Sequence, residues 1–344
     1  MRPGPHNALT DVPGLLVGQY ERLGGGWATG TSVVLAPEGA VGAVDVRGGG
    51  PGTRETDLLD PSHLVQRVNA ICLTGGSAYG LAAADGVMRH LGERHQGVPV
   101  GPTPEQVVPI VPAAVLFDLW RGDWGNRPDA EFGLRACAAA ADGPVAQGTV
   151  GAGTGAAAGW LKGGLGTASA VLADGTVLGA LVAANPKGDV LSPDGLPWAW
   201  HLGLPGEFPL RAPSPAELAA ANALRTPAES RLNTTIGVIA TDATLTKAEA
   251  RRLAVVAHDG LARAVRPVHS IFDGDTFFAL STARRDLADA DPVFGDAARA
   301  ARLDELCTVA ADVVSRAITH AVLHATGLPG LPAYRELFPS VVAG

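Results

Sequence analysis

Short apolar runs bounded by glycine dominate the first half of the chain and predict buried strands. The clearest of these runs lie at residues 31–35, 41–46 and 70–73. Residues 80–91 instead place apolar side chains at helical spacing and predict a helix. Farther along, apolar runs at 168–172 and 176–182 flank Asp174-Gly175, whose two-residue turn signal predicts an antiparallel hairpin.

The last third of the chain continues with strands and longer helices. A β-branched run at 234–240 predicts a buried strand, and Thr246 with Glu249 forms the capping-box pattern that opens a helix. Residues 277–280 predict one more strand. A long helix follows, whose apolar face is made of Leu306, Ala310, Val313, Val314, Ala317, Ile318 and Ala321.

The order of these elements favours an α+β fold. Strands and helices do not alternate strictly, which argues for a layered sandwich of helices around sheets. No internal repeat is visible at the usual solenoid periods, so we expect residues 1–344 to form one intertwined domain. Residues 191–230 stand apart because their many prolines break any long element, and we expect a long surface linker lying over the domain.

The composition is that of an ordinary globular protein and narrows the range of partners. Of the 344 residues, 47% are apolar and 17% are charged. The formal net charge of -8 leaves no basic surface to attract phosphate groups, so we expect neither nucleic acid nor an anionic membrane as partner. The 45 glycines predict many tight turns and places where backbone approaches backbone or ligand.

Cys72, Cys137 and Cys307 are odd in number, widely spaced and surrounded by apolar residues. We therefore expect buried free thiols in a reducing compartment rather than disulfides or a metal cluster. The N-terminus lacks the apolar core of a signal peptide, and no run approaches the roughly 18 apolar residues of a membrane span. These features predict a cytoplasmic protein.

Candidate chemistry lies where the proline-rich segment meets the strand at 234–240, because Thr234 follows Asn233 there. A threonine hydroxyl needs a base, and the α-amino group of an N-terminal threonine can serve because its reference pKa is about 8. Attack of the Thr234 hydroxyl on the carbonyl of Asn233 would give an ester, and its hydrolysis would free this amine. In isolation Asn-Thr-Thr is a common strand start, so these residues alone do not identify a nucleophile.

Asp273-Gly274-Asp275 follows in a predicted turn before the strand at 277–280. Two carboxylates this close can bind a cation, share a proton, or orient an ammonium group and a hydroxyl. An isolated Asp-Gly-Asp is more often a plain surface turn. His258 and His269 offer no close ligand spacing; we expect a surface histidine at His258, and neither a metal nor a cofactor.

Three glycine-rich stretches approach known motifs but lack the required context. Residues 150–155 are followed by more glycine and not by the helix of a dinucleotide-binding fold. Residues 48–53 lack the lysine of a phosphate-binding loop. Residues 76–80, with Ser77 and Tyr79, miss the Gly-x-Ser-x-Gly spacing by one residue. We expect all three stretches to be walls of a substrate pocket.

Several motifs occur in the order found in one enzyme family. They are Leu73-Thr74-Gly75-Gly76-Ser77-Ala78-Tyr79-Gly80-Leu81, Val111-Pro112-Ala113-Ala114-Val115, residues 150–155 and 162–169, Asn185-Pro186, Asn233-Thr234-Thr235 and Asp273-Gly274-Asp275. From about Leu9 to Thr282 the chain resembles peptidase family S58, the L-aminopeptidase/D-esterase and β-aminopeptidase family. The Asn-Thr junction and paired aspartates are most similar to its nylon-oligomer (6-aminohexanoate-oligomer) hydrolases, because the aminopeptidase branch typically has a serine nucleophile and a Ser-x-Glu pair.

The resemblance implies an αββα sandwich of the N-terminal-nucleophile hydrolase type. It also implies self-cleavage into an α chain, residues 1–233, and a β chain, residues 234–344, which stay associated, often as a homotetramer of such αβ units. The family commonly has an aromatic hydroxyl just after the Val-Pro-Ala-Ala motif. This chain has Phe117 there, so a phenyl ring replaces that hydroxyl in the expected substrate pocket.

The resemblance also implies roles for single residues. Thr234 is the nucleophile, and Asp273 and Asp275 orient its amine and hydroxyl. Asn185 donates to the oxyanion, a dipole worth about 3 kcal/mol in comparable sites, and Lys162 supports the nucleophile.

The leading hypothesis is a cytoplasmic amide hydrolase for 6-aminohexanoate oligomers, similar ω-amino-acid amides or short peptides with an accessible amine. The acidic pair could bind such an amine or the amine of Thr234 itself. An aminopeptidase, D-amino-acid amidase or β-aminopeptidase is the alternative among hydrolases, and acyl transfer to an amine would differ only in excluding water. From another class, an unprocessed ligand-binding homologue would remain a single intact chain.

Overall fold

The computed structural model describes residues 1–225, 232–287 and 296–341, and most strands in these residues join one mixed sheet. Its strands are β1 Leu16–Gly24, β2 Trp27–Val46, β3 Thr53–Arg54, β4 Arg67–Thr74, β7 Ala113–Val115, β10 Gly164–Val171, β11 Val177–Ala184, β12 Ile236–Ala243 and β13 Thr276–Arg285. Neighbours follow the order β10-β11-β12-β13-β2-β4-β7-β3, and β1 pairs with β2 beside this path. The pairs β12-β13 and β4-β7 are parallel, and the others are antiparallel.

Strand β2, 20 residues long, joins two halves of this sheet. Its first part pairs with β1 and β4, and its last part pairs with β13. Its pairing with β4 is irregular between Leu35 and Ala40, where the strand passes from one half to the other. Side chains of both halves meet in one buried cluster, for example Ile71 of β4 and Val238 of β12. The sheet is therefore folded onto itself as two packed layers.

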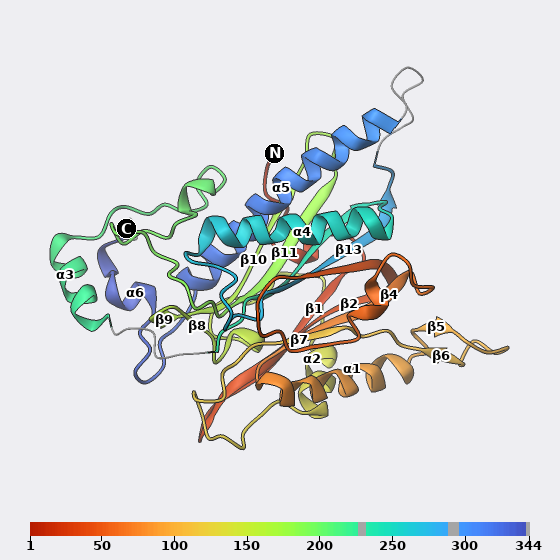
Figure 1. Ribbon diagram of the computed structural model, residues 1–344, viewed down its shortest axis with the longest axis horizontal. Coiled ribbons are helices and arrows are strands. Elements are labelled where there is room, and N and C mark those ends of the chain that lie inside the picture. Colours follow the sequence, from red (N-terminus) through yellow and green to blue (C-terminus); the bar gives the residue numbers. More distant parts are fainter. Residues whose placement is uncertain (226–231, 288–295, 342–344) are drawn as a thin grey trace.

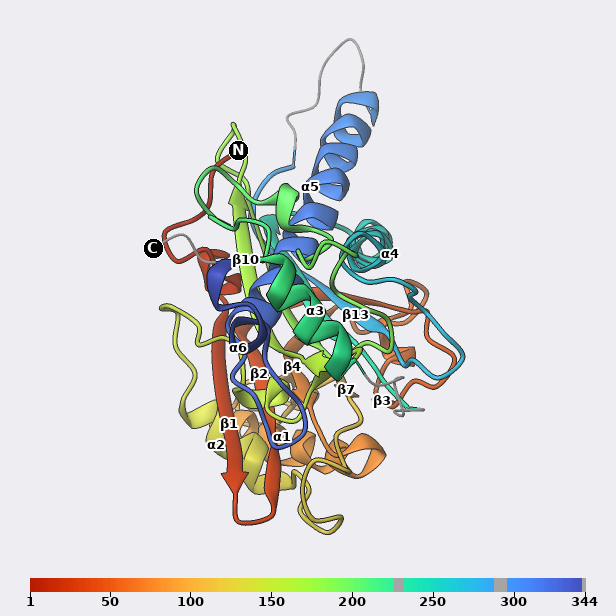
Figure 2. The same ribbon diagram turned by 90° about the vertical axis from the view of Figure 1, so that its left-hand side faces the viewer.

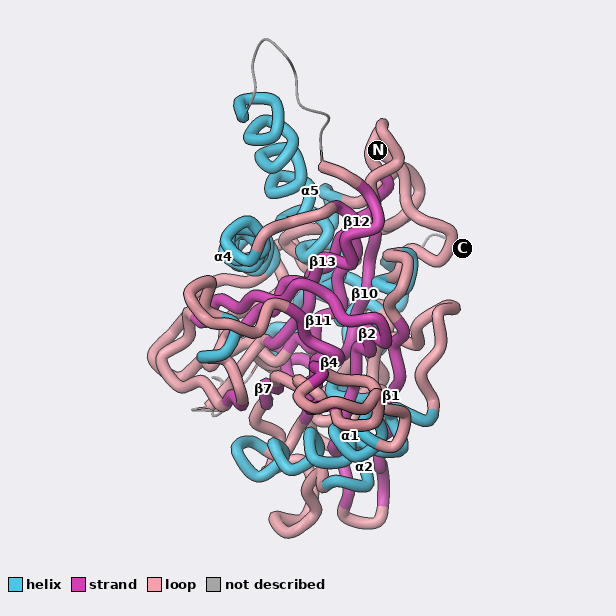
Figure 3. Tube along the Cα trace, turned by 90° about the vertical axis from the view of Figure 1, so that its right-hand side faces the viewer, coloured by secondary structure: helices cyan, strands magenta, loops and turns pink. Residues whose placement is uncertain are grey.

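Helices cover the two outer faces of this folded sheet (Figures 1 and 3). On one face lie α4 (Lys247–Ala264) and α5 (Asp296–Leu323), and on the other lie α1 (Ala83–Gly92) and α2 (Ala130–Ala138). Gly166 of β10 lets α5 approach, because a Cβ there would collide with the helix backbone. Two sheet layers between two helix layers form an αββα sandwich, which confirms the fold class expected from the sequence.

Most elements predicted from the sequence are confirmed. The hairpin around Asp174-Gly175 is the β10-β11 pair, in which Val171 lies opposite Val177. The helix opened by Thr246 is α4, and the Thr246 hydroxyl accepts a hydrogen bond from Glu249 N at 3.3 Å.

Two predicted elements differ in extent. The runs at 31–35 and 41–46 form the single strand β2, because the backbone between them stays extended. The run at 80–91 begins inside a 3-10 helix, Ser77–Ala82, and only then continues as α1. Two short strand pairs lie outside the main sheet: β5 (Val98–Pro99) with β6 (Val107–Val108), and β8 (Ala157–Ala158) with β9 (Leu161–Lys162).

The proline-rich segment 191–230 is not the surface linker that we expected. Its described part contains α3 (Pro215–Leu224), capped by Ser214, and this helix lies beside α6 (Tyr334–Leu337) (Figure 2). Leu191 and Phe208 are buried in the core beneath α4 and α5. The expectation failed for two reasons. Proline is well suited to the first turn of a helix, and the apolar residues between the prolines are buried in the core.

Helix α5 is the core helix of the molecule. By length and composition it is the one helix of the described chain that could cross a membrane, a run that the sequence pattern had not indicated. However, 89% of its apolar window is buried inside the protein, where it packs on β10, β11 and α4. Packing in a core explains the same apolar composition.

Candidate active site

Backbone hydrogen bonds hold the peptide bond between Asn233 and Thr234. Asn233 forms a parallel bridge with Asp273, and Thr234 N donates to the carbonyl oxygen of Asn185 at 2.9 Å. The carbonyl oxygen of Asn233 accepts from Gly274 N at 3.0 Å. Asn233 and Thr234 are only 3% and 5% exposed. The expected cleavage point is thus fixed inside the fold, between the end of β11 and the start of β13.

The Thr234 hydroxyl lies against the carbonyl group that it is expected to attack. Its Oγ1 donates a short hydrogen bond, 2.5 Å long, to the carbonyl oxygen of Asn233. A Cβ added at Gly274 would lie 2.8 Å from this Oγ1, so glycine leaves the hydroxyl its space. The Gly274 N–H group polarises the same carbonyl, as an oxyanion-hole donor does. The hydroxyl, the carbonyl group and the backbone donor therefore meet at one point, and this donor was missing from the sequence-based site.

Asp275 holds the backbone just after the junction. Its Oδ1 accepts from Thr235 N at 2.8 Å. Its Oδ2 accepts from His269 N at 3.2 Å and lies 2.8 Å from His269 Nδ1. Asp275 is 1% exposed, so these contacts take the place of water around the carboxylate.

Asp273 is equally engaged by the protein. Its Oδ2 accepts from Ser270 N at 2.9 Å and its Oδ1 from Lys187 N at 3.2 Å. Neither Asp273 nor Asp275 is hydrogen-bonded to Thr234 within the described part of the uncut chain. The acidic pair therefore fixes the loops around Thr234, and both carboxylates already have protein partners.

Asp275→Asn is expected to slow maturation about tenfold while leaving the fold largely intact, because the amide can satisfy either Thr235 N or His269 but not both. A time course on denaturing gels measures the cleavage, and circular dichroism checks the fold. Asp242→Asn is the matched control, since Asp242 is another buried carboxylate that accepts from a backbone N–H, that of Val177 at 2.8 Å. Normal cleavage and turnover in Asp275→Asn would remove Asp275 from the mechanism.

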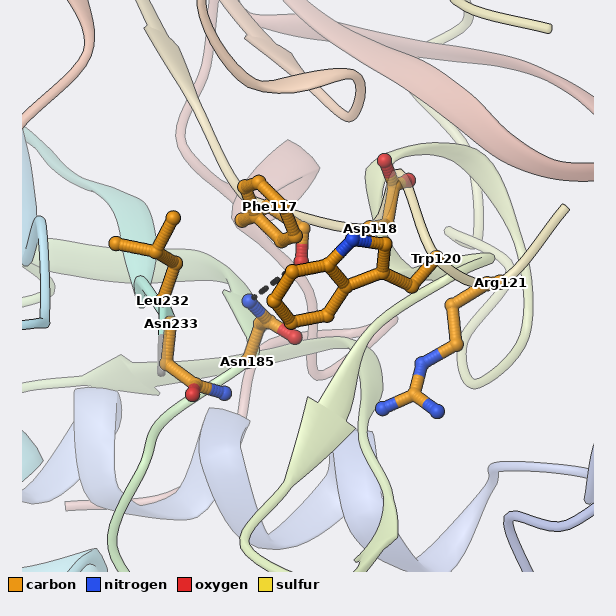
Figure 4. A pocket seen from close by; sticks show the side chains of 7 residues that line it. All are labelled: Phe117, Asp118, Trp120, Arg121, Asn185, Leu232 and Asn233. Atoms are coloured by element: carbon orange, nitrogen blue, oxygen red, sulfur yellow. Dashed lines mark hydrogen bonds between the residues drawn. The ribbon is translucent and has the colours of Figure 1, made fainter. Parts of the chain in front are cut away.

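The backbone orients the side-chain amide of Asn185. Its Oδ1 accepts from Ala157 N at 2.8 Å, and its Nδ2 donates to the carbonyl oxygen of Phe117 at 3.3 Å (Figure 4). Asn185 and Asn233 line the same pocket. Because Oδ1 and one N–H bond are used, the second N–H group of Nδ2 is left to donate to an oxyanion.

Lys162 is fully buried, and its Nζ donates to the carbonyl oxygens of Gly153 at 2.8 Å and Gly163 at 3.0 Å. Burial, together with the Arg121 charge, lowers the pKa of Lys162 to about 7, and the Asp118 charge opposes this shift. Part of the lysine population is therefore neutral near pH 7 and able to accept a proton. No hydrogen bond joins Lys162 to Thr234 in the described residues, so its support of the nucleophile stays a prediction.

A pocket of about 120 Å³ opens at Thr234. It is lined by Gly50, Pro51, Gly52, Ser77, Ala78, Val115, Leu116, Phe117, Leu232, Asn233, Thr234 and Phe272. Two of the expected pocket residues, Phe117 and Ser77, are among them. Tyr79 is not: it is exposed, and the guanidinium group of Arg127 lies 3.8 Å from its ring centre. Ser77 and Tyr79 share a 3-10 turn, whose threefold repeat directs residues two positions apart to different sides.

The structure adds two polar residues to the candidate site. Asp118 is buried and its Oδ1 accepts from Gly76 N at 2.7 Å. Burial raises the pKa of Asp118 to about 6, although hydrogen bonds to its carboxylate oppose this shift. The other residue is His269, whose ring contacts Asp275 as described above. The spacing of residues in the sequence indicated neither Asp118 nor His269, because each lies in a loop and not in a helix or strand.

His258 was expected on the surface, but it is buried on the inner face of α4. Its Nε2 lies 3.0 Å from the carbonyl oxygen of Asp45, and its ring centre lies 4.9 Å from that of His269. Burial lowers the pKa of His258 to about 4. The neutral ring is thus a packing element behind His269 and Asp275.

The described residues contain no group of three His, Cys, Asp or Glu side chains placed to hold a metal ion. The three cysteines are buried free thiols. Burial raises the pKa values of Cys72 and Cys137 far above the ordinary thiol range, so both stay protonated.

Two sequence comparisons extend over almost the whole chain. An uncharacterized aminopeptidase of Mycobacterium tuberculosis is 52% identical over 97% of this chain and 98% of its own length. A 6-aminohexanoate-oligomer endohydrolase of Paenarthrobacter ureafaciens is 32% identical over 92% of this chain and 84% of its own length.

The fold has a solved counterpart in the L-aminopeptidase D-Ala-esterase/amidase from Ochrobactrum anthropi, described as a variant of the Ntn-hydrolase fold. The two superpose with a TM-score of 0.70 over 99% of this chain and 91% of that chain, at 23% identity. The model of Peptidase family S58 matches residues 7–334. The protein therefore has the Ntn-hydrolase fold and belongs to peptidase family S58, a family of amide-bond hydrolases.

Proposed function

We propose that the protein is an autoprocessed N-terminal threonine hydrolase that cleaves 6-aminohexanoate oligomers and similar ω-amino-acid amides. One observation carries the proposal: Thr234 Oγ1 lies 2.5 Å from the carbonyl oxygen of Asn233, and Gly274 N donates to the same oxygen at 3.0 Å. The first hydrogen bond keeps the hydroxyl beside the preceding carbonyl group, and the Gly274 N–H group would stabilise the oxyanion that attack on this carbonyl group forms.

In the maturation step, Thr234 Oγ1 bonds to the carbonyl carbon of Asn233 and the C–N bond to Thr234 breaks. The hydroxyl proton leaves, the new amine of Thr234 takes up a proton, and an ester joins Asn233 to Oγ1. Water hydrolyses this ester to the Asn233 carboxylate. Before the cut Thr234 has only an amide nitrogen, so another base has to assist; Lys162 is the candidate because burial lowers its pKa to about 7.

In turnover the freed amine of Thr234 is the base for its own hydroxyl. The carbonyl oxygen of Asn185, which accepts from Thr234 N in the uncut chain, is placed to orient that amine. Oγ1 attacks the substrate amide, the amine product leaves, and water releases the acid. Gly274 N–H and Asn185 Nδ2 are the groups that we assign to the developing oxyanion.

Cyclic and linear 6-aminohexanoate oligomers are expected to be hydrolysed at rates that depend on chain length. Protein groups already occupy Asp273 and Asp275, which favours cleavage without an ammonium group beside the scissile bond. Mass spectrometry of the products from processed enzyme measures the reaction, with Thr234→Ala as the blank. Efficient cleavage of β-peptides or D-amino-acid amides, together with no cleavage of any ω-amino-acid oligomer, would replace this proposal by the aminopeptidase alternative.

The aminopeptidase alternative is favoured by the name of the mycobacterial relative, at 52% identity. An unprocessed binding protein, in contrast, would give one intact band on a denaturing gel. Membership of the family supports a small amide or oligomer as substrate. A cytoplasmic location and a tetramer of αβ units remain part of the proposal.

A further inference from the structure

A small pocket beside Asn233 has the side chain of Arg121 in its wall (Figure 4). The pocket is lined by Phe117, Asp118, Trp120, Arg121, Asn185, Leu232 and Asn233. Its walls therefore combine two aromatic rings, the proposed oxyanion donor Asn185, and the two residues that precede Thr234.

The charge of Arg121 is not matched by a contacting carboxylate. Arg121 is exposed, and within the described residues its guanidinium group makes no hydrogen bond and no ion pair. In Figure 4 the guanidinium group and the carboxylate of Asp118 point to opposite sides, and Asp118 accepts from Gly76 N instead. A guanidinium group that lines a pocket and has no carboxylate partner there can bind an anionic ligand through its forked donors.

The position of this pocket assigns it to the acyl part of a substrate. During maturation Asn233 becomes the acyl group of an ester on Thr234 Oγ1. During turnover the acyl part of the substrate becomes an ester on the same atom. Leu232 and Asn233 therefore occupy, before the cut, the place that a substrate acyl group takes afterwards, and Arg121 lines that place.

Next to Arg121 an apolar wall suits a methylene chain. The rings of Phe117 and Trp120 pack edge to face with centres 4.7 Å apart, and Trp120 is 57% exposed. Such a wall can bury a few methylene groups between the scissile carbonyl group and a terminal charge. An ammonium group at that terminus would instead meet the like charge of Arg121.

We infer that Arg121 recognises a carboxylate at the far end of the acyl group, so that half-amides of dicarboxylic acids are preferred substrates. The inference rests on the proposed amide hydrolysis by Thr234. It adds that the acyl-binding pocket selects substrates with a negative charge at the end of the acyl group. A substrate with an ω-ammonium acyl group is disfavoured unless its amine lies beyond the pocket, as in a longer oligomer.

Glutaryl, valeryl and 5-aminovaleryl p-nitroanilides test the inference, because their acyl chains are similar in length and end in a carboxylate, a methyl group and an ammonium group. Wild-type enzyme is expected to cleave the glutaryl compound with a kcat/KM about tenfold above the valeryl compound, and the aminovaleryl compound most slowly. Arg121→Gln should abolish the glutaryl preference, measured as the ratio of the glutaryl to the valeryl kcat/KM on fully processed enzyme, because loss of the Arg121 charge also affects Lys162 and with it the rate of maturation. Arg121→Lys should keep part of the preference, because the charge remains and the forked donor geometry is lost.

Arg89→Gln is the matched control, since it removes one arginine charge from the exposed side of α1. It should leave all three kcat/KM values unchanged. Equal wild-type rates on glutaryl and valeryl substrates, or a glutaryl preference that survives Arg121→Gln, would overturn the inference and leave the proposed hydrolase function standing. If processed wild-type enzyme cleaves no anilide and no oligomer, the proposed function fails and the inference fails with it.

Discussion

Thr234→Ala is expected to give one uncut chain of 34.9 kDa with no measurable amide hydrolysis. The wild type should instead give residues 1–233 and 234–344, the smaller of which has a mass of about 11 kDa, within the size range of fragments that share a core. The variant lacks the hydroxyl that lies 2.5 Å from the Asn233 carbonyl oxygen. Without the cut, no α-amino group is available as a base. Intact mass spectrometry and N-terminal sequencing measure both outcomes.

Two variants serve as controls for this result. Thr234→Ser keeps a hydroxyl in place and should still process. Thr235→Val should process too, because Thr235 Oγ1 is buried without a hydrogen-bond partner in the described structure and valine has nearly the same shape. Thr235→Ala should likewise be milder than Thr234→Ala, since neighbouring strand residues point to opposite faces. A fully active single chain, or a small chain that starts at Thr235, would contradict the assignment.

Asn185→Asp is expected to lower kcat by about a hundredfold to a thousandfold, as loss of an oxyanion-hole donor does. The substitution is nearly isosteric, and a carboxylate can still accept from Ala157 N, which lies 2.8 Å from Oδ1. The substitution removes the Nδ2 donor beside Asn233 together with its hydrogen bond to the carbonyl oxygen of Phe117, and places a negative charge there. Single-turnover kinetics on processed enzyme separate the chemical step from maturation.

Asn69→Asp is the matched control for Asn185→Asp. Asn69 is also buried, and its Oδ1 also accepts from a backbone N–H, that of Ile110 at 3.2 Å. This variant should keep wild-type kcat. If Asn185→Asp is as active as Asn69→Asp, the oxyanion depends on other donors, and Gly274 N–H would be the remaining candidate.

Local signals explain which parts of the fold could be predicted from the sequence. The Asp174-Gly175 turn and the Thr246 cap act within a few residues, so they predicted the β10-β11 hairpin and α4. The structure of residues 191–225 depends on distant partners, because Leu191 and Phe208 are buried in a cluster that includes residues of β10, β11, α4 and α5. The crossing of β2 between two sheet layers likewise depends on pairing with β13, more than 200 residues away.

The candidate site was predictable where a side chain carries the chemistry. The ordered motifs indicated Thr234, Asn185 and the acidic pair, and the structure brings these residues together. The Gly274 N–H group was missed because a backbone donor has no side-chain signature. Arg121 was missed for a different reason: an arginine is ordinary on any surface, and only the absence of a contacting carboxylate in the described fold distinguishes it.

The strand order has a consequence for the molecule after a cut at Asn233. Strands β12 and β13, from the small fragment, lie between β11 and β2 of the large fragment. Unfolding of the uncut chain is unimolecular, but unfolding of the cut molecule releases two polypeptides, so its midpoint then depends on protein concentration. When the uncut chain folds, it loses the entropy of closing a loop within one chain. When the two fragments fold together, they lose the larger entropy of two separate chains that associate. Folding is therefore favoured before the cut. Once unfolded, the cut molecule would refold only if its two fragments associated again.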